Sequence, residues 1–312
     1  MISGRATRER KLAVCSGSAS LDPGERAELL TVLAEDGDEL ICERAGGALT
    51  SQPLESFVMA LKGDAPAAQL FRHCGRSLVE DPTIATALAK NWRCPPQFLP
   101  AAAKRLPTSA VQELMLDLDR LSAQPALASA LLQSASLTAD QHQQLEELLR
   151  EDLPPADTFA NAVESDLDPE KRVTLIQRLS RMRIVERVQC ALKGNREERV
   201  ALIRDPCKVV QRAVLQSPRI TEREIEGFAA MANLSDEVLR VISMMRKYAK
   251  NYIVTRNLLN NPKTPIDVSL HLLPKVNAQD LKSLQSNKNI PETLKSAANR
   301  LQRQREAARK TE

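Results

Sequence analysis

A group of basic and aromatic residues occurs between positions 246 and 256 of the sequence. Cationic side chains neutralise phosphates, and aromatic rings stack on unpaired bases, so their interleaving indicates a nucleic-acid site. Alternatively, the tyrosines fill a helix junction and the cations occupy a helix C-terminus, where positive charge is favourable. The candidate binding residues are Arg246, Lys247, Tyr248, Lys250, Tyr252 and Arg256.

A second basic group precedes it at spacings of three, two and four residues. Its members are Arg178, Arg181, Arg183 and Arg187. This spacing predicts a basic helix face, which is explained equally well by a solvated surface.

Residues that perform catalysis or bind metals do not occur at diagnostic spacings. The three histidines, His73, His142 and His271, stand singly outside any HExxH pattern. The six cysteines include no CxxC pair, and no nucleophile has an identifiable base nearby in the sequence. We therefore expect no enzymatic activity, no cofactor and no metal.

The segment Asp205–Ala229 has the pattern of two short helices with a joint between them. Val209, Val210, Ala213 and Val214 form an apolar stripe at helical spacing. Ser217-Pro218 ends the first helix, because proline disfavours helical backbone in the residue before it. Thr221 and Glu224 have capping-box spacing and begin the second.

A similar joint occurs in the segment Ala249–Leu273. Here Asn261 is expected to take the left-handed helix end, and Pro262 to block continuation. Thr264 is expected to cap the next helix, with Pro265 at its first position.

These two segments resemble the variant leucine-rich repeat, whose pattern is DPxxxVRxxVAxNPxTPxxxL, and more broadly HEAT and armadillo repeats. The residues in register are Asp205, Pro206, Val210, Val214, Ser217, Pro218 and Thr221, then Val254, Asn261, Pro262, Thr264 and Pro265. The resemblance implies a superhelix of stacked helices that binds other macromolecules. The N-terminal cysteine cluster that holds an iron–sulfur centre in the best-known such protein has no counterpart here.

The joints recur along the chain at a mean interval of about 42 residues, within the range of HEAT and armadillo arrays. The aligned positions are Gly47, Ala89, Leu132, Leu179, Leu215 and Leu259. With only 10 glycines and 3% aromatic residues, the composition also favours short joints and helical packing. We expect an all-α, right-handed α-solenoid of about six roughly 42-residue, three-helix repeats.

Charge divides the chain into two halves of opposite sign. Residues 1–170 contain 15 basic and 26 acidic residues, whereas residues 171–312 contain 29 and 14. We expect a flexible segment over 1–22, an acidic half of the array over 23–155, a basic half over 156–290 and a C-terminal capping helix over 291–312.

No segment has the length and apolar character of a signal peptide or a membrane span, so no membrane association is expected. Scattered cysteines favour reduced thiols and therefore a cytoplasmic location.

The leading functional interpretation is a non-enzymatic helical-repeat scaffold that binds another macromolecule through its curved surface, with a protein as the favoured partner. The alternative is nucleic-acid binding by the basic C-terminal half. Some HEAT-like proteins are DNA glycosylases, but aromatic residues are scarce, and the single tryptophan, Trp92, lies in the acidic half. A third interpretation is head-to-tail association of the two oppositely charged halves.

Overall fold

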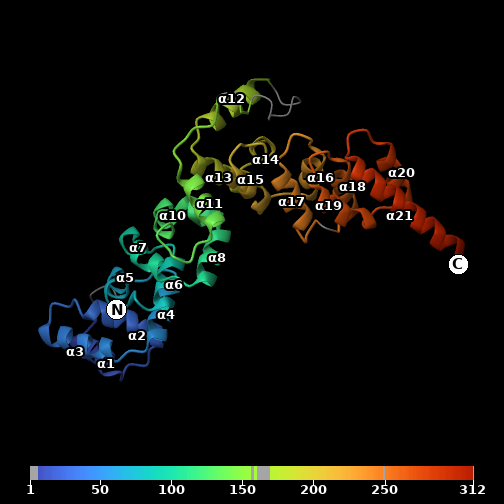
Figure 1. Ribbon diagram of the computed structural model, residues 1–312. Helices are drawn as coiled ribbons and strands as arrows, with labels where there is room; N and C mark the ends of the chain where they lie inside the picture. The colour runs from blue at the N-terminus through green and yellow to red at the C-terminus, as the bar shows by residue number, and fades with distance from the viewer. Residues whose placement is uncertain (1–5, 156–157, 160–168, 249, 312) are drawn as a thin grey trace. The chain divides into compact units, whose positions relative to one another are not determined.

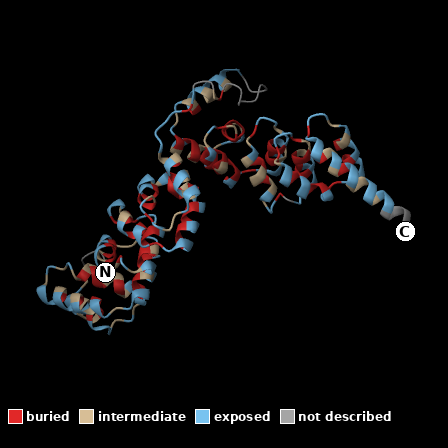
Figure 2. Ribbon diagram, in the orientation of Figure 1, coloured by how far each residue is buried: buried red, intermediate tan, exposed pale blue. Residues whose placement is uncertain are grey.

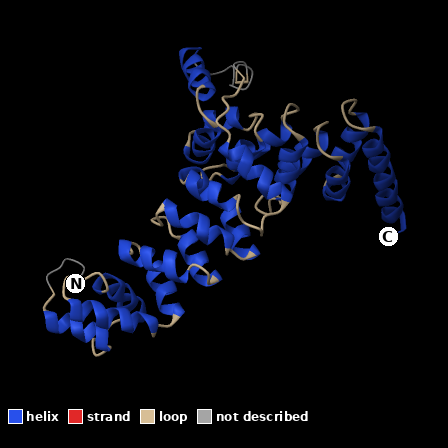
Figure 3. Ribbon diagram, turned by 60° about the vertical axis from the view of Figure 1, so that its left-hand side comes forward, coloured by secondary structure: helices blue, strands red, loops and turns tan. Residues whose placement is uncertain are grey.

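The computed structural model describes residues 6–155, 158–159, 169–248 and 250–311. Every regular element in these ranges is helical, and none is a strand (Figure 3). The all-α class is therefore confirmed for the described residues. Residues 156–157 and 160–168, at the start of the predicted basic half, lie outside these ranges, as does Ala249.

The chain forms two compact units, Met1–Leu149 and Arg150–Glu312, called here the N-terminal and C-terminal units. Sequence analysis places the corresponding division between residues 155 and 156.

The N-terminal unit is built from short helices (Figure 1). They are α1 (Arg8–Ser16), α2 (Pro23–Leu33), α3 (Glu39–Thr50), α4 (Leu54–Leu61), α5 (Ala68–His73), the π-helical η1 (Cys74–Leu78), α6 (Pro82–Lys90), η2 (Pro96–Phe98), α7 (Leu99–Lys104), α8 (Thr108–Leu116), α9 (Leu118–Ala123), α10 (Pro125–Leu131) and α11 (Ala139–Leu149).

Aspartates begin several of these helices. The carboxylates of Asp22, Asp38 and Asp81 accept hydrogen bonds from backbone N–H groups in the first turns of α2, α3 and α6. Proline follows two of these aspartates, where its fixed φ angle suits the first helical position.

Residues 8–16 are helical, although the sequence predicted a flexible segment over 1–22. Val14 and Cys15 are buried, and α1 packs against α2 and α3. Burial of one apolar edge stabilises a helix whose polar composition alone does not predict order.

The C-terminal unit contains the remaining helices (Figure 1). They are α12 (Pro169–Ser180), α13 (Ile184–Lys193), α14 (Arg196–Leu202), α15 (Lys208–Gln216), α16 (Glu222–Ala230), α17 (Asp236–Met244), α18 (Tyr252–Asn260), α19 (Ile266–Leu272), the 3-10 turn η3 (Leu273–Lys275), α20 (Ala278–Ser286) and α21 (Glu292–Thr311).

Helices two apart in this unit pack against each other, as α13 does on α15 and α16 on α18. Their apolar faces meet, while the outward faces stay exposed (Figure 2). Between stacked helices, for example, Ser235 donates to Gln211, 24 positions earlier, and Asn261 donates to Ala229, 32 positions earlier. These separations are shorter than the predicted 42-residue interval.

The joint predicted within Asp205–Ala229 forms as expected. Thr221 and Glu224 make the capping box that begins α16. Ala213, Leu215 and Phe228 are buried in the helix packing, as is Leu259 of α18. The apolar stripe therefore correctly identified the core of this unit.

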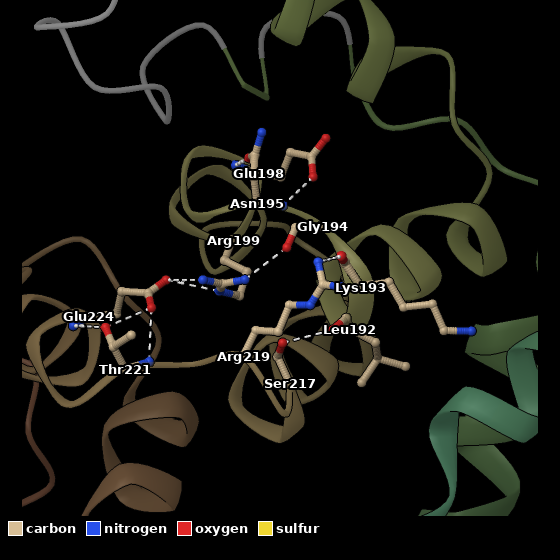
Figure 4. Close-up of polar contacts among 10 residues, drawn as sticks. All are labelled: Leu192, Lys193, Gly194, Asn195, Glu198, Arg199, Ser217, Arg219, Thr221 and Glu224. Carbon is tan, nitrogen blue, oxygen red and sulfur yellow. Dashed lines mark hydrogen bonds and ion pairs between the residues drawn. The ribbon is translucent and has the colours of Figure 1, made fainter.

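Polar side chains at the joints reach back to the preceding helices. The Ser217 hydroxyl donates to the carbonyl of Leu192 at 2.8 Å, and Arg219 donates to that of Lys193 at 2.9 Å (Figure 4). Both carbonyls lie in the last turn of α13, where they have no partner within the helix. The joints thus cap the neighbouring helix as well as ending their own.

The joint after α18 differs from its prediction. Asn261 has extended backbone (φ −83°, ψ 121°), not a left-handed helix end, consistent with the proline that follows it. Its amide donates to the carbonyls of Ala229 and Met231, both at 2.9 Å. Thr264 donates to the Leu258 carbonyl, and Pro265 occupies the N-cap position.

Candidate functional site

The predicted basic and aromatic cluster lies on the loop between α17 and α18 and on the first turns of α18. Tyr248 is only 1% exposed, so it fills the helix junction. The Lys247 ammonium lies 5.1 Å from the centroid of the Tyr248 ring. This tyrosine therefore offers no open face to a base.

The other aromatic residue, Tyr252, holds α18 to α20. Its hydroxyl donates to the carboxylate of Asp280 and accepts from the backbone N–H of Asn277 at 3.2 Å. Burial and the hydrogen bond to Asp280 raise the pKa of Tyr252. Arg256 pairs with the same carboxylate at 3.3 Å, so a structural role accounts for both residues.

Three of the predicted residues, Arg246, Lys247 and Lys250, are exposed on the loop. Within the described part of the chain, neither Arg246 nor Lys250 has an ion pair. The structure thus places these three cations on the surface, buries Tyr248 and leaves Tyr252 39% exposed with its hydroxyl bound. Binding by this cluster stays a prediction.

The second basic group is divided between surface and core. Arg187, predicted on a solvated face, is 2% exposed and pairs with the fully buried Asp205, with Nε 2.9 Å from Oδ2. Arg178 pairs with the carboxylate of Glu198. The prediction of a basic face is therefore wrong for Arg187, because its partner lies on the α14–α15 loop.

The Asp205 carboxyl has an unusual environment. Burial raises its pKa to about 6, while the Arg187 guanidinium and the Cys207 N–H oppose that rise. The Cys207 N–H donates to Asp205 Oδ1 at 2.8 Å, and a second Arg187 nitrogen donates to the Met182 carbonyl at 3.0 Å.

A second buried pair links α14 to α16. Arg199 donates to Glu224 Oε1 at 2.9 and 2.8 Å and to the Gly194 carbonyl at 2.9 Å (Figure 4). The other oxygen of Glu224 accepts from the Thr221 backbone and hydroxyl. The capping-box glutamate is thus also an ion-pair partner, and its hydrogen bonds offset the cost of its burial.

The N-terminal unit contains a surface groove of about 610 Å³. The end of α4 and the turn after it form one wall, and α6 with residues 91–93 forms the other. Val58, Leu61 and Ala87 give it an apolar lining. Mostly apolar concave surfaces with a few polar groups are typical of ligand sites.

Trp92, the single tryptophan of the chain, lines this groove and is 48% exposed. The guanidinium of Arg120 lies 5.4 Å from the centroid of its ring. Arg120 is itself buried, and it donates to the carbonyls of Ala89 and Lys90. Because two hydrogen bonds hold the Arg120 guanidinium in place, it supports the indole in one orientation.

Charged side chains surround the apolar lining. Lys62, Lys90 and Arg93 contribute three cations, of which Lys90 also pairs with Glu113, and Asp64 contributes one carboxylate. The unit as a whole is acidic, with 14 basic and 19 acidic residues over positions 1–149. The groove is therefore a locally cationic site on an acidic unit, suited to an anionic ligand with an apolar group.

The cysteines and histidines do not converge on a site. No group of His, Cys, Asp and Glu in the described ranges could hold a metal ion. Burial raises the pKa of both Cys74 and Cys94 to about 12, which disfavours the nucleophilic thiolate. The described helices also include none long and apolar enough to cross a bilayer.

One feature of the sequence indicates the groove. Asn91-Trp92-Arg93 stands between a helix end and Pro95-Pro96, where a large apolar side chain cannot join a helical stripe. A tryptophan at such a position is either buried in the core or exposed as a contact residue for a partner. Which of the two applies depends on the residues packed around it. The lining residues from α4 are some 30 positions away, so their proximity is not visible in the sequence.

Comparisons of the chain with protein-family models, with curated proteins and with solved structures find no match.

Proposed function

We propose that this chain is a non-enzymatic helical-repeat protein that binds a partner protein through the groove at Trp92. The occupant is an extended acidic segment that carries at least one large apolar side chain. The apolar side chain contacts Trp92 and the lining of α4 and α6, while carboxylates meet Lys62, Lys90 and Arg93.

The observation that carries this proposal is an exposed tryptophan whose orientation is already fixed. Tryptophan is enriched among the residues that dominate binding energy at protein interfaces. A side chain held by Arg120 loses little conformational freedom on binding, so more of the interaction energy contributes to affinity.

The helical packing supports the wider interpretation as a binding scaffold. Helices two apart in the chain stack in the C-terminal unit, as in solenoid proteins, where each repeat contacts its neighbours. A right-handed solenoid of about six repeats is part of the proposal, with shorter repeats than 42 residues favoured by the hydrogen-bond separations.

Selection from a displayed library of random peptides tests the proposed occupant. Wild-type protein should enrich peptides with acidic residues beside an aromatic or large aliphatic residue. Trp92→Ala should weaken binding of the enriched peptides by about 30-fold, the scale of an interface hot spot. Lys62→Glu with Arg93→Glu should weaken it further, because both cations would become repulsive.

Matched variants separate a local effect from a general one. Leu116→Ala removes another exposed apolar side chain, and Arg76→Glu with Lys104→Glu makes the same charge change away from the groove. Both should bind the peptides as the wild type does. Enriched peptides that bind Trp92→Ala undiminished, or that lack acidic residues, would contradict the proposal.

A further inference from the structure

The joints of the C-terminal unit lie along two edges of the helix array. The joints that follow α13, α15, α17 and α19, together with Lys193 at the end of α13, form the first edge. It is called here the basic edge and comprises residues 193–195, 217–221, 245–248, 250–251 and 273–277. Joints that follow α14, α16, α18 and α20 form the opposite edge, residues 203–207, 231–235, 261–265 and 287–291.

Hydrogen bonds connect successive joints along the basic edge. Arg219 donates to the Lys193 carbonyl, which joins the first two. Asn251 donates to Glu226 in the second turn of α16, and Asn277 donates to the Tyr252 hydroxyl. Each joint thus contacts either the preceding joint or the helix that begins there, which places the joints in one row.

The charge on the two edges differs. The basic edge carries six exposed cations and no carboxylate; they are Lys193, Arg219, Arg246, Lys247, Lys250 and Lys275. The opposite edge carries three cations and the buried Asp205. One exposed carboxylate, Glu222, lies beside the basic edge in the first turn of α16.

We propose that the basic edge binds the phosphate backbone of double-stranded nucleic acid without reading its sequence. Stacked helices lie roughly 8–10 Å apart, so the four joints extend over roughly 25–30 Å. That length covers about eight base pairs of a duplex at about 3.4 Å each. This surface is separate from the groove at Trp92, and neither proposal depends on the other.

The positions of the two tyrosines favour a duplex over a single strand as the ligand. Single-strand sites combine cations with aromatic rings on which bases stack. Here Tyr248 is buried, and Tyr252 is 39% exposed with its hydroxyl bound to Asp280, so the edge has one partly exposed ring beside six cations. Contact through charge alone favours the partner with the higher charge density, and a duplex carries about twice the charge of one strand per unit length.

Fluorescence anisotropy with the full chain and a labelled DNA duplex of about 30 base pairs tests this proposal, with the salt raised from about 50 to about 200 mM. With six phosphate contacts, affinity should fall about a thousandfold over that range. Arg246→Glu with Lys250→Glu should weaken binding at low salt by at least about tenfold and flatten the salt dependence.

The control is Lys263→Glu with Lys288→Glu, which makes the same change in net charge on the opposite edge. It should retain most of the wild-type affinity. Equal losses in the two variants, or no duplex binding at low salt, would overturn the proposal. Tighter binding of oligo-dT than of the duplex would contradict the choice of a double-stranded ligand. Binding of polyglutamate as tight as that of the duplex would also contradict it, because the edge would then suit an acidic protein.

Discussion

At the residue scale, Arg187 and Asp205 form a buried ion pair that contributes to the stability of the C-terminal unit. Both side chains are almost completely removed from solvent, at 2% and 0% exposure. Neither can lose its partner without leaving a charge in the interior. Breaking such a pair costs about 3–5 kcal/mol, even where replacing both partners costs little.

Arg187→Met should therefore change both the stability of the unit and its pH dependence. The folded-state pKa of Asp205 is about 6, above its ordinary value of 3.8. The contribution of Asp205 to stability is therefore fully present at pH values below its ordinary pKa, and it is lost as the pH rises through about 6. Without Arg187, which lowers this pKa, the loss should be larger and continue to higher pH. Urea unfolding at several pH values measures it.

The double variant Arg187→Met with Asp205→Asn removes the titrating group and is the control. Its free energy of unfolding should lack this additional fall with pH. A single variant whose stability rises with pH relative to the double variant would contradict the assignment.

This pair also marks a limit of sequence analysis at the residue scale. The spacing of Arg178, Arg181, Arg183 and Arg187 predicts a single helix face, but only Arg178 and Arg187 are helical, and they lie on α12 and α13. Spacing also cannot distinguish a solvated arginine from a paired one. The partner, Asp205, is on a later loop, and only the packing of α13 on α15 brings the two together.

At the element scale, the joints were the most predictable feature. Ser217-Pro218 and the Thr221–Glu224 box act within four residues, so local chemistry determines them. Asn261 was predicted less well, because its amide serves carbonyls about 30 positions earlier in the chain. Local rules therefore locate a joint but do not show which helix its polar side chains cap.

Leu215→Ala tests the packing of these elements. Leu215 is 2% exposed, and its truncation should cost about 2–5 kcal/mol. In the proposed solenoid, stability is close to a sum over neighbouring repeats, so amide exchange should accelerate in the C-terminal unit first.

The exposed Met244 provides the comparison for this variant, because Met244→Ala should cost less than about 0.5 kcal/mol. Equal acceleration of exchange in both units by Leu215→Ala would show that they unfold together, contrary to the prediction.

At the scale of the whole molecule, counts of charged residues predicted the acidic and basic halves but not where the charges act. In the basic half, ion pairs with carboxylates are formed by Arg187, Arg199 and Arg256. The cations of the basic edge, in contrast, are exposed. In the acidic half, cations gather around Trp92. Composition therefore predicted the sign of each half, and helix packing determines its surfaces.

The most direct test of the central claim uses the emission of the only tryptophan. Because the chain contains no other, its fluorescence reports on the groove alone. Titration with an acidic peptide from the library selection should shift the emission of Trp92 to shorter wavelength as the indole leaves water. Lys62→Glu with Arg93→Glu should move that transition to at least about tenfold higher peptide concentration, as expected when attraction becomes repulsion. A peptide that binds without changing the emission of Trp92 would contradict the account.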